Sequence, residues 1–262
     1  MKVVVFGAGY WGKNYIRELG RRCVLVVEPD PVKARNISEQ FEVPSAPALP
    51  PDVEFDGAVL AVPPMLNAAL AEPLLLQGKY VLVEKPFALS TAEARRLVAY
   101  KRCMAAHIYL WHPSVIELAE RLPSLDVDHL FSRRTNNGPI RTWPVEWDLG
   151  VHDVSIFYYL SGWEKPMEVW CHRGENYALL NLEFSRWDAS SYVSWLGGPK
   201  VRELDVVEKS KGVREVFDDV STVLGTPPLA LMLEEFLTGA WSDRGQAQVG
   251  YDVVEILERM TR

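Results

Sequence analysis

The segment KVVVFGAGYWGKNYIREL, residues 2–19, determines the architecture of the chain. Its apolar run at Lys2–Phe6 lacks polar alternation, which predicts a strand buried on both faces, as inside a parallel sheet. Next, Gly7 permits a tight turn, Gly9 allows the backbone close to a pyrophosphate, and Gly12 lets the following helix pack against the strand. Free N–H groups at that helix start suit a diphosphate. The segment predicts a dinucleotide-binding turn, the alternative being a glycine turn of another α/β protein.

An acidic residue stands where such a turn requires one. The next apolar run, Cys23–Val27, predicts a second strand that ends at Glu28. A carboxylate about 20 residues past the glycines normally accepts hydrogen bonds from the adenosine ribose. Glu28 therefore favours NAD, since it would repel a 2′-phosphate, while Lys33 and Arg35 leave NADP possible.

Composition narrows the class of protein. The 262 residues, 48% of them hydrophobic, suffice for two modest domains, and a formal charge of −7 argues against a nucleic-acid partner. The three cysteines, Cys23, Cys103 and Cys171, are too widely spaced for a metal or redox motif, which favours buried thiols in a reducing compartment. No apolar run approaches the roughly 18 residues of a membrane span. We expect a soluble, cytoplasmic protein with no membrane partner.

Strand and helix patterns then alternate. Apolar runs at 57–62 and 80–83 predict strands, and helical patterns cover 32–41, about 66–77 and about 91–102, the last capped by Ser90 with Glu93 three residues on. This alternation predicts a parallel, doubly wound sheet whose ligands lie beyond the carboxyl ends of the strands. Lys85 falls on that rim.

Four sequence blocks together resemble the Gfo/Idh/MocA oxidoreductase family. They are Gly7–Gly12, Ala61-Val62-Pro63-Pro64, Glu84-Lys85-Pro86 and Asp148-Leu149-Gly150-Val151-His152-Asp153. The resemblance implies a Rossmann domain at 1–112, then an α/β domain at 113–262 with a mainly antiparallel open sheet, and an active site between them. It also implies cofactor contacts from Gly7, Gly9, Tyr10, Trp11, Gly12, Glu28, Pro63 and Glu84.

The second half of the chain has strand patterns at 125–131, 168–172, 177–184 and 191–196. Most of the tryptophans also fall there. Some of them either form a sheet face for self-association, giving a homodimer or homotetramer, or belong to the core. Helical patterns at 229–237 and 249–259 follow.

The expected chemistry centres on Asp148 and His152. They are four residues apart at the start of a predicted helix, 148–160, so their Cβ atoms should lie about 5–6 Å apart on one face. His152 suits the base that takes a hydroxyl proton as hydride leaves the same carbon, with Asp148 in support. Lys85 would polarise the same oxygen. Members of the family differ over which of lysine and histidine takes the proton. Taken singly, a helix cap, a buried histidine and a solvated lysine are the alternatives.

The substrate is less defined. The segment 132–141 is similar to the branch of the family acting on nucleotide-linked sugars, including UDP-N-acetylglucosaminuronate 3-dehydrogenases. Arg134, Asn136 and Arg141 are the candidate substrate contacts, the arginines either binding a carboxylate or diphosphate or being surface charges. Two departures affect the pocket: Asn67 stands where many relatives have histidine, and the passage 219–227 is short. The remaining histidines have no metal-ligand spacing, so no metal is expected.

The prediction is an NAD-dependent oxidoreductase acting on a secondary hydroxyl of a sugar or nucleotide sugar, with Lys85, Asp148 and His152 as catalytic residues. Lys85 and His152 would also touch the substrate. The alternatives are a non-catalytic dinucleotide sensor and a redox-assisted, glycosidase-like enzyme of the same family.

Overall fold

The computed structural model describes residues 1–196, 199–209, 214–216 and 226–261. Contacts divide the chain into two compact units. The first comprises Met1–Ala106 and Leu229–Tyr251, and the second comprises His107–Pro228 and Asp252–Arg262. Among the described helices, none is long and apolar enough to cross a membrane.

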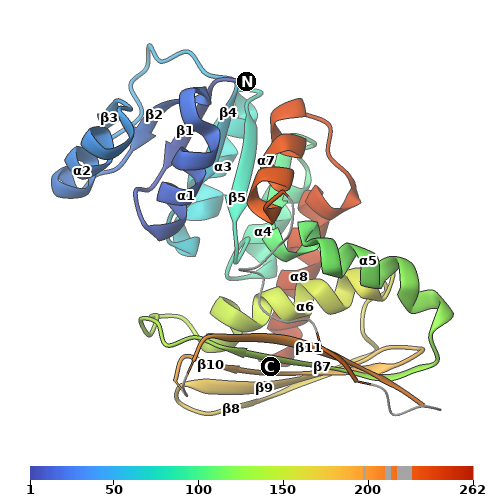
Figure 1. Cartoon of the computed structure of the whole chain (residues 1–262). Helices are drawn as coiled ribbons and strands as arrows, with labels where there is room; N and C mark the ends of the chain where they lie inside the picture. Colours follow the sequence, from blue (N-terminus) through green and yellow to red (C-terminus); the bar gives the residue numbers. More distant parts are fainter. Residues whose placement is uncertain (197–198, 210–213, 217–225, 262) are drawn as a thin grey trace. The chain divides into compact units, whose positions relative to one another are not determined.

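The first unit contains a six-stranded parallel sheet flanked by helices, which confirms the doubly wound prediction (Figure 1). The strand order is β3-β2-β1-β4-β5-β6. The strands are β1 (Val3–Phe6), β2 (Cys23–Val27), β3 (Ser45–Ala46), β4 (Gly57–Leu60), β5 (Tyr80–Glu84) and β6 (Cys103–Ala106). The helices are α1 (Tyr10–Leu19), α2 (Pro31–Phe41), α3 (Asn67–Leu76), α4 (Thr91–Val98) and α7 (Pro228–Thr238), with short 3-10 turns at Gly20–Arg22, Pro64–Leu66 and Asp243–Gly245.

Local signals explain most of these elements. All of β1 is buried between β2 and β4, as its unbroken apolar run requires. The hydroxyl of Ser90 accepts the N–H of Glu93 at 3.3 Å, and the Glu93 carboxylate accepts the N–H of Leu89 at 3.2 Å. Ser90 therefore caps the start of α4 as predicted, while the Glu93 carboxylate reaches the residue before the cap. The helix ends at Val98 rather than near residue 102, because the chain must turn before it enters β6.

The sequence predicts a single domain boundary after residue 112. In the structure, Leu229–Tyr251 returns to the first unit. Aromatic side chains account for it. Phe236 is wholly buried, and a Cβ on Gly57 would lie 3.1 Å from its ring. Trp241 stacks on Phe236 and meets the edge of Tyr80, with ring centroids 6.4 and 6.0 Å away. The segment therefore covers the beginnings of β4 and β5.

The second unit contains a six-stranded sheet in the order β12-β11-β7-β10-β9-β8. Among the strand pairs of the described residues, only β7–β10 is parallel, so the mainly antiparallel prediction is confirmed. The strands are β7 (Val127–Thr135), β8 (Glu168–Arg173), β9 (Tyr177–Glu183), β10 (Asp188–Ser194), β11 (Val201–Glu208) and β12 (Arg214–Val216). The helices are α5 (Pro113–Arg121), α6 (Val151–Leu160) and the end of α8 (Ala247–Met260), with 3-10 turns at Ile108–Trp111 and Leu122–Ser124 and a π-helix at Glu146–Gly150.

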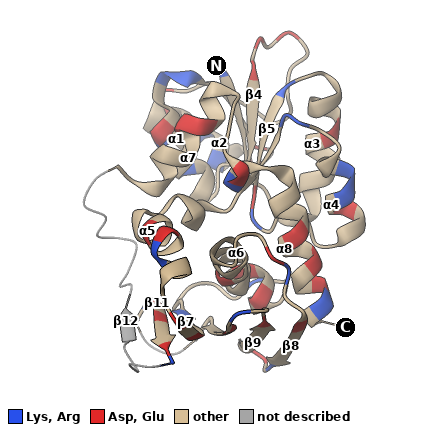
Figure 2. Ribbon diagram, turned by 90° about the vertical axis from the view of Figure 1, so that its right-hand side faces the viewer, with Lys and Arg blue, Asp and Glu red and all other residues tan. Residues whose placement is uncertain are grey.

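Helices α5 and α6 lie over one face of this sheet (Figure 1). Nine of the ten residues of α6 are buried, as expected for a helix that is apolar nearly all round and is covered on both sides. Acidic side chains recur along α8 (Figure 2). Two of them, Asp252 and Glu255, form ion pairs with Lys165, with their carboxylate oxygens 2.7 and 2.5 Å from its Nζ. These contacts hold the end of α8 to the second unit.

The described tryptophans differ in burial. Trp187 and Trp195 are buried in the core, whereas Trp170 on β8 is 52% exposed on the opposite face. Most of the passage 219–227 lies outside the described residues.

Candidate active site

The glycine turn after β1 has the shape that a diphosphate requires. Gly7 has a φ of 94°, a left-handed conformation that side chains disfavour, and a Cβ on Gly12 would collide with the carbonyl oxygen of Gly7. A Cβ on Gly9, in contrast, would meet nothing within 4 Å. Gly9 also precedes α1, whose first turn has no side-chain cap and no acidic residue. The open side of the turn and the uncapped N–H groups of α1 fit a bound dinucleotide.

Glu28 lies directly after β2, and its carboxylate joins two backbone segments. One oxygen accepts the N–H of Ala8 at 2.8 Å and the other accepts the N–H of Asp30 at 3.0 Å. Because a carboxylate has about four acceptor positions, it can still receive ribose hydroxyls. Lys33, a candidate for a 2′-phosphate, is 3.6 Å from the carboxylate of Asp30. Both arrangements favour NAD over NADP.

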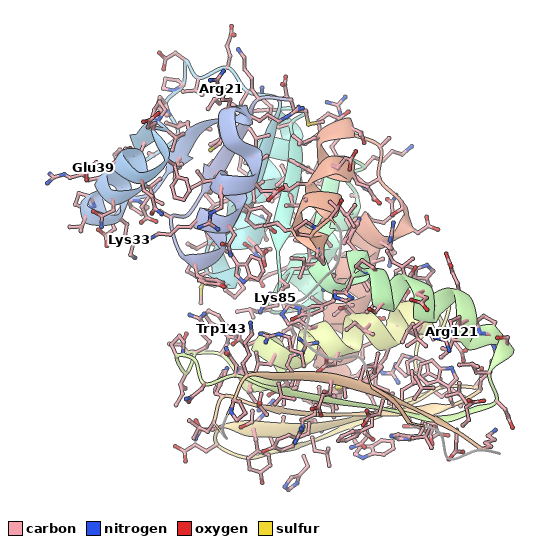
Figure 3. The ribbon with its side chains drawn as sticks, in the orientation of Figure 1. Arg21, Lys33, Glu39, Lys85, Arg121 and Trp143 are labelled. Atoms are coloured by element: carbon pink, nitrogen blue, oxygen red, sulfur yellow. The ribbon has the colours of Figure 1, made fainter. Side chains whose placement is uncertain are left out.

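Replacement of Glu28 by alanine should therefore weaken the binding of NAD by roughly tenfold or more, as expected for lost charge-assisted hydrogen bonds. The binding of NADP should be weakened less. Calorimetric titration with both cofactors measures the ratio. Glu39→Ala is the control, because Glu39 points outward from α2 (Figure 3). A larger loss for NADP would show that Glu28 does not contact the ribose.

Lys85 (labelled in Figure 3) follows β5 directly, and the turn that carries it is held by buried polar groups. The Glu84 carboxylate accepts the Tyr15 hydroxyl at 2.6 Å and the N–H of Lys85 at 3.0 Å. Burial raises the pKa of Glu84, against the opposing hydrogen bond from Tyr15. The amide of Asn67 donates to the carbonyl oxygens of Glu84 and Pro86 at 3.1 and 3.0 Å. Asn67, which stands where many relatives have histidine, thus fixes the backbone on both sides of Lys85.

The other cofactor candidates of the first unit lie around the same edge of the sheet. Tyr10 is 75% exposed and meets the edge of Trp11, with ring centroids 5.8 Å apart. Pro63 is exposed and follows β4, the neighbour of β1. Their positions beyond the carboxyl ends of β1 and β4 agree with the expected ligand edge.

In the second unit, Asp148 lies in the π-helix and His152 in the first turn of α6. The helical segment begins at Glu146, earlier than predicted, and a π-turn precedes the α-helix. Such turns are common at functional sites. Both residues are buried, being 8% and 6% exposed. The indole N–H of Trp195 donates to the Asp148 carboxylate at 3.0 Å. Asp148 is therefore a fixed carboxylate near the start of α6.

Arg141 and Asn136 are the candidate substrate contacts that remain accessible. The Nε of Arg141 is 3.9 Å from the Asp148 carboxylate, its side chain is 44% exposed, and its guanidinium lies 5.9 Å from the ring centre of Trp143. Asn136 is half-buried just after β7, where its N–H donates to the carbonyl oxygen of Ser194 at 2.9 Å. These two residues can still meet a ligand.

Arg134 has a different environment from the one expected of a substrate contact. It is 4% exposed, and its Nε and Nη2 donate to Asp153 at 3.0 and 2.7 Å. Asp153 also accepts the Ser191 hydroxyl at 2.7 Å. Burial opposes the charge on Arg134, but Asp153 outweighs it and the pKa of Arg134 is raised. Arg134 is a buried cation paired with α6, which leaves Arg141 and Asn136 as the accessible candidates.

Sequence reasoning missed three polar residues of these sites. Tyr15 and Trp195 hold Glu84 and Asp148 by hydrogen bonds. Glu146 lies two residues before Asp148 in the sequence. It is fully buried and forms an ion pair with Arg173. In the sequence, Tyr15 shares the apolar face of its helix with Ile16 and Leu19, which is a weak signal, and its partner depends on a contact between distant segments. Among the described residues, no group of three or more His, Cys, Asp or Glu side chains is arranged to hold a metal ion.

Residues 1–107 match the model of an oxidoreductase family with an NAD-binding Rossmann fold. The first unit therefore contains an NAD-binding Rossmann domain of the oxidoreductase class, consistent with the open glycine turn. The matched family is Gfo/Idh/MocA, so over residues 1–107 the match confirms the resemblance found in the sequence.

Curated relatives match over part of their length. The chain is 28% identical over 194 residues to UDP-N-acetylglucosamine 3-dehydrogenase of Acidithiobacillus ferrooxidans, covering 64% of this chain and 56% of the relative. It is 25% identical over 188 residues to 4-carboxy-2-hydroxymuconate-6-semialdehyde dehydrogenase of a Sphingobium species, covering 62% and 59%. The matches thus span less than two thirds of these relatives.

A solved structure shares the whole fold. Myo-inositol dehydrogenase from Lactobacillus casei, in complex with NAD(H) and myo-inositol, has a TM-score of 0.83 at 15% identity, covering 100% of this chain and 94% of that one. At this identity the likeness shows the fold alone.

Proposed function

We propose that this protein is an NAD-dependent dehydrogenase that transfers hydride between a secondary hydroxyl of a sugar or nucleotide sugar and nicotinamide. The observation that carries the proposal is the buried Asp148 carboxylate, fixed by Trp195 four residues before His152. A paired carboxylate and imidazole at the start of a helix suit proton transfer. The family match and the open turn at Gly9 support the cofactor.

The proposed roles follow from the chemistry of each group. Bound at the glycine turn, NAD would supply the hydride acceptor. His152 takes the hydroxyl proton, Asp148 stabilises the resulting imidazolium, and Lys85 donates a hydrogen bond to the oxygen as negative charge develops there. Two buried carbonyl contacts from Asn67 support a fixed position for Lys85 on the first unit. Asn67 thus fixes the backbone at Lys85, and Trp195 fixes the Asp148 carboxylate. In the proposed reaction, these are two of the groups whose positions determine the rate.

We further propose that the substrate carries an anionic group. Arg141, half-exposed and close to Asp148, is suited to a carboxylate or a diphosphate oxygen. The names of the two curated relatives include a UDP-sugar and a carboxylated semialdehyde, and both compounds are anionic. This supports testing nucleotide sugars and sugar acids before neutral polyols.

The test is NADH formation by the purified chain with a panel of nucleotide sugars, sugar acids and free polyols. The proposal expects stoichiometric release of NADH with at least one anionic member. Cofactor binding without turnover across the panel would favour a dinucleotide sensor. Bond cleavage without net NADH would favour a redox-assisted enzyme.

We also propose that the protein forms a homodimer or homotetramer through the sheet face opposite α5 and α6, and that it acts in the cytoplasm. Trp170 and Tyr177 are 52% and 39% exposed on this face, and Tyr192 stands 6.1 Å from Tyr177 between ring centres. Aromatic residues are enriched in interface cores. The three cysteines are free thiols, which agrees with a reducing compartment.

Trp170→Asp should weaken this association by on the order of tenfold or more, because a desolvated charge would replace an aromatic anchor. Sedimentation velocity over a range of concentrations measures the change. Leu76→Asp is the control, since Leu76 is 71% exposed at the end of α3 in the first unit. An unchanged sedimentation profile for Trp170→Asp would remove this face from the assembly.

A further inference from the structure

Tyr109 contacts His152 directly. The centres of the two rings are 4.8 Å apart and their planes are inclined by 71°, an edge-to-face arrangement. Tyr109 belongs to the 3-10 turn Ile108–Trp111, at the start of the second unit, and is 8% exposed. Aromatic pairs favour this geometry, which restricts rotation of both rings. The orientation of the His152 imidazole therefore depends on where Tyr109 is held.

Two arginines hold Tyr109. The guanidinium of Arg134 lies over the ring, 4.3 Å from its centre, and the Nε of Arg202 donates to the phenolic oxygen at 2.6 Å. A cation over the ring face and a donor at the hydroxyl constrain the ring in different directions. Tyr109 thus connects His152 to two strands of the sheet.

The arginines themselves are placed by the sheet register. Arg134 on β7 and Arg202 on β11 are direct cross-strand partners. Like charges in such a position repel unless they are compensated. The carboxylate of Asp153 pairs with Arg134, and Asp153 is the residue after His152 on α6. The same helix therefore presents His152 to Tyr109 and the counter-ion to the arginine that holds Tyr109.

We propose that Tyr109 is a positioning residue for His152, and that its ring, fixed by Arg134 and Arg202, sets the orientation of the imidazole. This inference rests on the proposed function only where it concerns turnover. The ring contact itself is a feature of the fold. Loss of the contact should lower kcat on the order of tenfold, the size expected from one aromatic pair, and leave the KM for NAD unchanged.

The experiment compares Tyr109→Leu, Tyr109→Phe and the control Tyr158→Leu in the full chain. Tyr158 is a suitable match because it is a buried tyrosine with a hydrogen-bonded hydroxyl, which donates to Asp252 at 2.8 Å, and its ring meets Trp163. The readouts are the ring-proton NMR signals of His152, assigned by their absence in His152→Ala, and the separate values of kcat and KM. The spectra are recorded without cofactor.

Tyr109→Leu should shift the His152 signals, because the ring current of Tyr109 is lost, and should lower kcat. Tyr109→Phe, which retains the ring, should largely preserve the positions of the His152 signals and the value of kcat. Tyr158→Leu should leave the His152 signals in place. If Tyr109→Leu does not fold, Tyr109→Met, whose unbranched side chain adapts better to an irregular site, is expected to give the same shift.

Unmoved His152 signals in a folded Tyr109 variant, or an equal shift in Tyr158→Leu, would overturn the positioning role. Failure of the proposed function looks different. In that case the His152 signals still shift in Tyr109→Leu, but the parent protein forms no NADH with any member of the panel, or His152→Ala turns over normally.

Discussion

Lys85→Met should reduce turnover by on the order of 10² or more while NAD binding is retained. Methionine keeps most of the side-chain volume and removes the ammonium group that would stabilise charge on the substrate oxygen. The turn itself should survive, because it is held by the Glu84 carboxylate on the Lys85 backbone N–H and by the amide of Asn67 on neighbouring carbonyls. None of these contacts uses the lysine side chain.

Steady-state kinetics and calorimetric titration of NAD measure the two parts of this result. Lys79→Met is the matched control at the other end of β5, where the Lys79 ammonium donates to the carbonyl oxygen of Phe55 at 2.7 Å. It should turn over as the parent protein does. Equal turnover in the Lys85 and Lys79 variants would exclude Lys85 from the chemistry.

His152→Ala should also lose on the order of 10² or more in turnover, as expected when a general base is removed. His152 is buried beside Tyr109 and four residues after Asp148, so alanine deletes the imidazole without disturbing the Trp195 contact to Asp148. NAD affinity should be unaffected, since the glycine turn and Glu28 belong to the first unit.

The pH profile gives this prediction a second measurement. The parent protein should lose activity below the pKa of its base, and His152→Ala should lack that limb. His172→Ala is the control, because His172 is exposed on β8. A profile that keeps the same acidic limb without His152 would assign the proton to another group, with Lys85 the first candidate.

Much of the first unit was predictable because its signals are local. The apolar run of β1, the glycines after it and the Ser90–Glu93 cap each act within a few residues. The strand β6, Cys103–Ala106, was missed because its sequence, Cys-Met-Ala-Ala, contains no β-branched or aromatic residue. Its place at the sheet edge is set by pairing with β5, a contact distant in sequence.

The second unit was less predictable. Alternation along β9 correctly indicated one buried face, with Ala178, Leu180 and Leu182 inside. Strand β11 shows no clear alternation of apolar and polar residues at its start. Its first three residues, Val201, Arg202 and Glu203, are all half-buried, so none of them marks an inner or an outer face. Its register against β7 nevertheless determines which arginine lies opposite Arg134.

The sequence by itself determined the dinucleotide turn, the position of Glu28 and the succession of family motifs, because glycine conformation and strand–helix order are written in neighbouring residues. Tertiary structure alone decided that Arg134 is buried against Asp153, that Trp195 donates to Asp148 and that Tyr109 faces His152. The physical reason is that the role of a buried polar group depends on its partner. Each of these partners comes from a segment that only folding brings near.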